Sequence, residues 1–135
     1  MAAIRPPAAA ARLRAILEHP DPELVAALTA FAHGMERFLA GGATQPRLPV
    51  ACTRASAQFR DSARRTRTRI AAVQTTLKAR GLLLDAFDDL IAALTRAEQI
   101  LSAPRREQHP AMFLAAVRAI DTSRRRIWAV QRSLR

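Results

Sequence analysis

Apolar residues recur along this chain at intervals of three and four residues, in segments that prolines and glycines separate. Such spacing places them on one side of an α-helix, and no segment alternates as a β-strand does. The pattern predicts a short helix at 8–18 and four long helices at 22–40, 50–80, 82–102 and 110–134. We therefore expect one all-α domain over residues 1–135, an up-down antiparallel bundle of four long amphipathic helices plus the short N-terminal helix.

Each predicted helix carries a stripe of small or apolar residues. Residues three and four apart lie on the same face of a helix, so each stripe is expected to pack in the core. The third stripe is Cys52, Ser56, Phe59, Ala63, Thr66, Ile70, Val73 and Leu77; the fourth is Leu83, Phe87, Leu90, Leu94, Ala97 and Leu101; the fifth is Phe113, Ala116, Ile120, Ser123, Ile127, Val130 and Leu134.

Between residues 50 and 102 the chain forms either a hairpin or one continuous helix, and the two predictions differ at Gly81. The stripe after Gly81 is out of phase with the stripe before it. Lys78 and Arg80 suit the last turn of a helix, and Gly81 suits the left-handed residue just beyond it. Leu77 would then contact Leu82, as in a Schellman cap. We expect a break at Gly81 with the flanking helices packed antiparallel, and the continuous helix is the alternative.

The chain has a formal net charge of +11, and all but one of its 22 basic residues are arginine. This imbalance favours attraction to an acidic protein surface, to nucleic acid or to an anionic membrane. A GC-rich genome also favours arginine codons, so the choice of arginine over lysine does not by itself indicate a function. The charge is segregated, because residues 54–80 and 104–135 are strongly basic whereas residues 82–103 carry four acids against one arginine.

Two arginine-rich helix faces are the candidate sites for a polyanion or a protein partner. They comprise Arg60, Arg64, Arg65, Arg67 and Arg69 on the third predicted helix, and Arg118, Arg124, Arg125, Trp128 and Arg132 on the fifth. One interpretation is that both faces are solvated and pair partly with the acids of the fourth helix. The other is that their guanidinium groups bind phosphate or carboxylate groups of a partner through two donors each.

Trp128 is the only tryptophan of the chain. Arg124 and Arg132 lie four residues before and after it, which allows guanidinium groups to stack on the indole. Either Trp128 broadens the core stripe beside Ile127, or it anchors a protein interface or stacks on bases. We expect partial burial, nearer to the core interpretation, with one edge exposed between Arg124 and Arg132.

No motif in the sequence indicates catalysis, a cofactor or a metal ion. The residue types that could serve are scattered: His19, His33 and His109 are not at metal-ligand spacing, Asp85, Asp88, Asp89 and Glu98 are spread around one helix, and Cys52 falls on a core stripe. Metal sites and phosphate loops need closely defined spacings, and none is present. We expect no enzymatic activity, no cofactor and no metal.

These patterns predict a non-enzymatic binding or assembly module, a basic helical bundle that docks an acidic partner protein. Sequence-nonspecific nucleic-acid binding is the alternative, and peripheral attachment to an anionic membrane is a third possibility. Self-association is compatible with each of them. The chain shows no signal peptide, no apolar run of the ~20 residues that a membrane span needs, and a single cysteine, which together predict a cytoplasmic protein.

Overall fold

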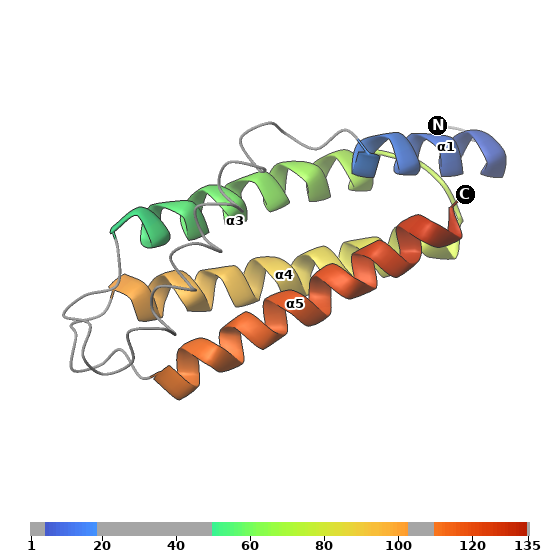
Figure 1. The fold of residues 1–135 in the computed structure, drawn as a ribbon. Coiled ribbons are helices and arrows are strands. Elements are labelled where there is room, and N and C mark those ends of the chain that lie inside the picture. The colour runs from blue at the N-terminus through green and yellow to red at the C-terminus, as the bar shows by residue number, and fades with distance from the viewer. Residues whose placement is uncertain (1–4, 19–49, 103–109, 135) are drawn as a thin grey trace.

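The computed structural model of the chain describes residues 5–18, 50–102 and 110–134, which are almost entirely helical (Figure 1). The helices are α1 (Pro6–Glu18), α3 (Val50–Ala71), α4 (Lys78–Ser102) and α5 (Pro110–Ser133), and these ranges contain no strand. The prediction of an all-α protein is confirmed. The helix expected at 22–40 lies outside the described residues.

The three long helices run up and down, with α4 packed against both α3 and α5. Figure 1 shows α4 running in the opposite direction to its two neighbours, so each adjacent pair is antiparallel. The short helix α1 packs against α3 at the end of the bundle where α3 connects to α4. The C-terminal end of α5 reaches the same end, where Arg14 Nη1 donates a hydrogen bond of 3.3 Å to the carbonyl oxygen of Leu134.

The core follows the predicted stripes. Most of the side chains expected to be buried have little or no exposure, because each helix turns its stripe toward its neighbours. Alanine and serine on several stripes allow the helix backbones to approach closely. The buried members include Ser56, Phe59, Ala63 and Ile70 of α3, Leu83, Phe87, Leu90, Leu94 and Ala97 of α4, and Phe113, Ala116, Ile120 and Ser123 of α5. Leu13 and Ile16 of α1 are buried as well.

The helical hairpin is present, but it turns earlier than the sequence predicts. α3 ends at Ala71 and α4 begins at Lys78, so the expected boundaries at residues 80 and 82 are wrong. Gly81 lies in the first turns of α4 and does not adopt a left-handed backbone conformation. The Schellman cap expected there is therefore absent.

Side chains near the connection explain its position. The Thr75 hydroxyl accepts a hydrogen bond of 3.2 Å from the backbone N–H of Leu77, which stabilises the turn ahead of α4. Arg80 Nη2 donates a bond of 2.7 Å to the carbonyl oxygen of Ala71 and so caps the last turn of α3. Val73 remains buried although it lies in the connection. The sequence pattern therefore predicted the burial of Val73 correctly, but it assigned this residue to a longer helix rather than to the turn.

Candidate docking surface

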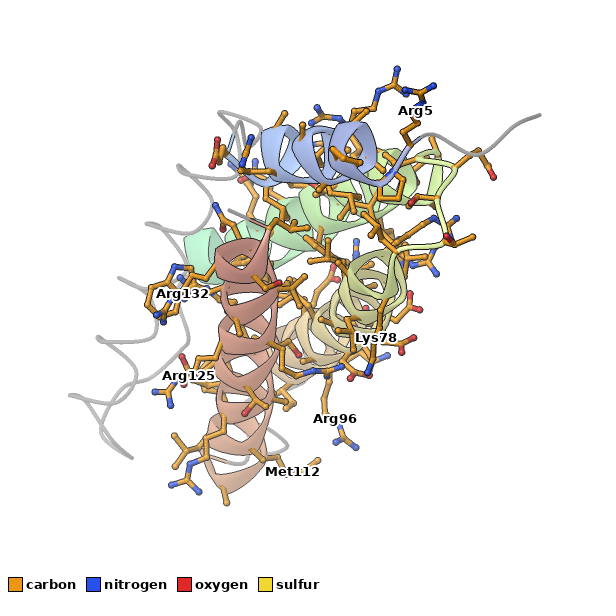
Figure 2. All side chains as sticks on the ribbon, turned by 90° about the vertical axis from the view of Figure 1, so that its right-hand side faces the viewer. Arg5, Lys78, Arg96, Met112, Arg125 and Arg132 are labelled. Atoms are coloured by element: carbon orange, nitrogen blue, oxygen red, sulfur yellow. The ribbon has the colours of Figure 1, made fainter. Side chains whose placement is uncertain are left out.

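One flank of α5 carries an aromatic residue and a row of arginines. Arg118, Arg125 and Arg132 recur every seven residues and are exposed, so they form one line along the helix. Trp128 lies between this line and the buried stripe, beside Ile127. Figure 2 shows Arg125 and Arg132 on the same side of α5.

Trp128 is on the surface rather than in the core, because 58% of its area is exposed. The expected partial burial is present, but the indole is more exposed than the expectation of a position nearer the core. Ile127 faces the interior and is packed against the core, and the next residue of a helix is rotated by about 100° from it. The guanidinium carbon of Arg132 lies 4.9 Å from the centroid of the indole, which is within the range of a cation–π contact.

Beside Trp128 there is a pocket of about 260 Å³ to which all four described helices contribute. Its wall is mainly apolar, since Ile16, Phe59, Phe87 and Ile127 line it together with the indole. Arg124 lines it as well, which places a guanidinium group at an apolar opening. An exposed tryptophan beside an apolar pocket is typical of the anchor region of a protein interface.

Several of the predicted binding arginines are engaged within the bundle instead. Arg67 donates to both carboxylate oxygens of Asp88, at 2.5 and 3.2 Å, in a two-pronged ion pair between α3 and α4. Arg60 forms ion pairs with Glu98 of α4 and with Asp61 of its own helix. These contacts confirm, for the inner edge of α3, the interpretation that arginines pair with the acids of the fourth predicted helix.

The remaining candidates are exposed. Arg125 makes an ion pair of 3.1 Å with Asp121 one turn earlier, and both side chains are largely in solvent. Such a pair contributes little to stability and leaves the guanidinium group accessible. Arg65 is exposed but has an interaction of its own. Five of the candidate arginines are exposed and make no ion pair within the described part of the chain: Arg64 and Arg69 of α3, and Arg118, Arg124 and Arg132 of α5.

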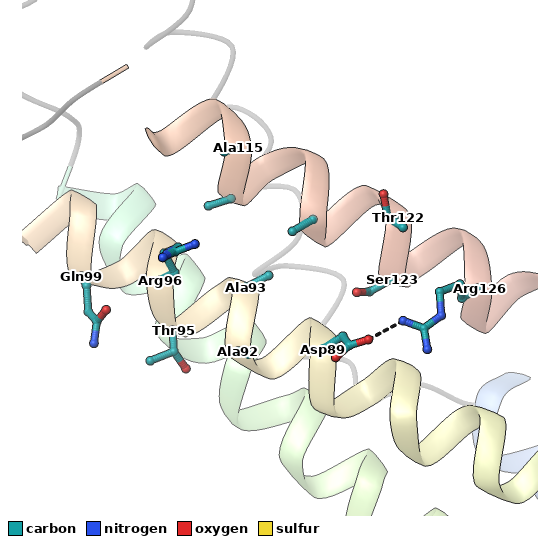
Figure 3. Close-up of a pocket in the computed structure, with 12 residues that line it drawn as sticks. Asp89, Ala92, Ala93, Thr95, Arg96, Gln99, Ala115, Thr122, Ser123 and Arg126 are labelled. Carbon is teal, nitrogen blue, oxygen red and sulfur yellow. Dashed lines mark hydrogen bonds and ion pairs between the residues drawn. The ribbon is translucent and has the colours of Figure 1, made fainter. Parts of the chain in front are cut away.

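Sequence reasoning missed three arginines that have structural roles. Arg14 and Arg80 donate to backbone carbonyl groups at the ends of helices, a role that depends on how those ends meet. Arg126 forms an ion pair with Asp89 across α4 and α5 (Figure 3). Their sequence separation of 37 residues carries no local signal, because the register between α4 and α5 brings the two together.

The described residues hold no group of three or more histidine, cysteine, aspartate or glutamate side chains that could bind a metal ion. His19, His33 and His109 lie outside these residues, as does the side chain of Cys52. Among the described helices, none has both the length and the apolar character that crossing a bilayer requires.

The fold and this surface together describe an all-α protein in which one flank of α5 exposes a tryptophan and several arginines. Comparison of the chain with models of protein families, with curated proteins and with solved structures found no match.

Proposed function

We propose that this chain is a non-enzymatic binding module that docks an acidic partner protein on the Trp128 flank of α5. The observation that carries the proposal is the exposure of Trp128 beside an apolar pocket. Tryptophan and arginine are the residue types most enriched at the points of an interface that dominate binding energy. The proposal includes a cytoplasmic location and a complete up-down bundle of four long helices, with residues 22–40 as one of them.

The expected partner segment follows from the chemistry of the flank. An apolar side chain of the partner fills the pocket beside Trp128, because the pocket is lined mainly by apolar side chains. Carboxylate groups on the same segment bind Arg124, Arg125 and Arg132, since a guanidinium group engages a carboxylate through two donors. An amphipathic acidic helix has both features and matches a helix-in-groove mode of recognition.

The unpaired arginines on α3 favour a second candidate function, sequence-nonspecific binding of nucleic acid. Arg64 and Arg69 are exposed and distant in sequence from the Trp128 flank. Phosphate contacts do not require an apolar pocket, so arginines on both helices would contribute to such binding. The third possibility, attachment to an anionic membrane, requires the same charges.

Trp128 provides the assay, because its fluorescence reports on its own environment without a label. We would titrate the chain with a peptide that forms an acidic amphipathic helix with one leucine face, and with a basic peptide of the same apolar pattern. The acidic peptide is expected to shift the emission to shorter wavelength as it covers the indole, and the basic peptide is not. A duplex DNA and vesicles with anionic lipid complete the set of probes.

Two matched double variants separate the candidates, because each removes two positive charges. Binding of a labelled acidic peptide is expected to weaken on the order of tenfold or more in Arg124→Ala/Arg132→Ala, since two contacts near the anchor are lost. It is expected to change little in Arg64→Ala/Arg69→Ala. Equal weakening of peptide and DNA binding by both variants would instead support the nucleic-acid function, in which affinity follows total charge.

A further inference from the structure

A second surface of the molecule is a groove between α4 and α5, on the side of the bundle away from α1 (Figures 2 and 3). The groove has a volume of about 720 Å³. Its floor is made largely of alanines: Ala92 and Ala93 from α4, and Ala115, Ala116 and Ala119 from α5. Because these side chains end at Cβ, another helix can approach the floor closely.

Ser123 places a polar group in this floor. It is only 2% exposed and lines the groove. Figure 3 shows the side chain directed into the space between the two helices.

Two opposite charges on α4 have no ion-pair partner among the described residues: Arg96 lines the groove, and Asp85 lines a separate pocket near the α3–α4 connection. Most acids of α4 pair inside the bundle, Asp88 with Arg67 and Asp89 with Arg126. Asp85 and Arg96 are exposed and make no ion pair within the described residues. They are eleven residues apart, which is three turns or about 16 Å along one side of the helix.

Large apolar side chains are exposed at both ends of this face. Leu82 of α4 is 44% exposed and Met112 of α5 is 48% exposed. Each lies near the beginning of its helix, and the two helices are antiparallel, so the two residues lie toward opposite ends of the α4–α5 pair, outside the lining of the groove itself. Apart from Trp128, they are the large apolar residues that the described chain exposes most.

We propose that this groove is a self-association surface, in which α4 of a second copy lies antiparallel to α4 about a twofold axis between Asp89 and Ala92. That axis brings Asp85 opposite Arg96 of the second copy, and Arg96 opposite Asp85 of the second copy. It also brings Leu82 to the end of the α4–α5 pair that carries Met112 of the second copy. A twofold interface must be self-complementary, and this arrangement of charges meets that condition.

The net charge of the chain favours this surface over others. Two chains of +11 repel one another, and the repulsion is smallest at a face where positive and negative side chains balance. Residues 82–103, with four acids and one arginine, are the acidic segment of the chain, and they include most of α4. Basic α3 and the Trp128 flank then face solvent and stay available for an acidic partner.

Sedimentation equilibrium of the full chain at low salt tests the proposal. We expect a concentration-dependent monomer–dimer equilibrium in the wild type. Arg96→Asp and Asp85→Arg are each expected to weaken dimerisation on the order of tenfold, because two exposed attractive pairs become two repulsive ones. The double variant Asp85→Arg/Arg96→Asp is expected to restore it, since the exchanged charges again face each other across the axis.

Two controls keep the test specific. Arg118→Asp removes as much positive charge as Arg96→Asp from an exposed site on another face of α5, and it should not weaken the dimer. Ala92→Gln should weaken it by obstructing the approach of the helices, whereas Ala15→Gln on the exposed side of α1 should not. Circular dichroism verifies that each variant retains its helices.

Three results would overturn the proposal: a wild type that stays monomeric at its highest soluble concentration, single charge reversals without effect, or a double exchange that fails to restore the dimer. Substitution of Arg124 and Arg132 should leave the dimer unchanged, because they lie on the other flank of α5. Sedimentation equilibrium therefore tests self-association independently of the peptide-binding assay, so failure of one proposal can be distinguished from failure of the other.

Discussion

Replacement of Trp128 by alanine tests whether this tryptophan serves the fold or a partner. The matched substitution is Phe113→Ala, because Phe113 is a large aromatic residue on the same helix with 0% exposure. If Trp128 is a surface anchor, its loss should affect stability much less than the loss of Phe113, although tryptophan is the larger residue.

The expected magnitudes follow from burial. Removing a fully buried aromatic side chain costs about 3–5 kcal/mol, which is the expectation for Phe113→Ala. Trp128 is 58% exposed, so less than half of its surface is buried, and truncation removes correspondingly less buried contact area. With the Arg132 contact of about 0.5–1 kcal/mol included, Trp128→Ala should cost about 1–2 kcal/mol. For a chain of this size, 1 kcal/mol lowers Tm by roughly 3–4 °C.

Thermal unfolding followed by circular dichroism at helical wavelengths gives both values without a tryptophan signal. We expect one cooperative transition, with Tm lowered by about 3–8 °C in Trp128→Ala and by at least twice as much in Phe113→Ala. Equal destabilisation by the two substitutions would refute the reasoning, because it would mean that the chain itself covers the indole in solution.

Two further substitutions test the contacts at α3. Ser62→Ala should leave stability unchanged or raise it slightly in urea unfolding, because the buried Ser62 hydroxyl has no hydrogen-bond partner among the described residues. A clear loss of stability would show that the hydroxyl is bonded. Arg80→Ala should lower the free energy of unfolding by about 1–2 kcal/mol in the same measurement, because it removes the charged donor that caps the carbonyl group of Ala71. Lys78→Ala, at an exposed neighbouring site, is the control and should cost little.

The all-α class and most of the buried positions were predictable, because burial and helical periodicity are properties of each segment alone. Phe87, Leu94 and Phe113 fall on their predicted stripes and are buried. The site was predictable only in part. The stacking of Arg132 on Trp128 follows from a separation of four residues within one helix, whereas the exposure of the indole depends on how neighbouring helices are placed around α5.

Contacts between helices were the part that local patterns could not supply. The pocket beside Trp128 draws residues from four helices, and the Arg126–Asp89 pair depends on the register of α4 against α5. The sequence predicted that arginines would pair with acids of the fourth predicted helix, but it did not predict which acid Arg67 would contact. In each case, the relevant distance is fixed by packing between segments that are far apart in sequence.

Gly81→Ala is expected to change the stability of the protein in opposite directions for the predicted and the observed hairpin. At a left-handed position an alanine is strained, so the substitution would destabilise the protein. In the structure Gly81 lies within α4, and a Cβ added there meets no atom within 4 Å. Alanine should then stabilise the chain by about 0.5–1 kcal/mol, because glycine loses more backbone entropy in a helix. An increase in the urea midpoint at unchanged m-value would verify the turn at 72–77, and a decrease would return the break to Gly81.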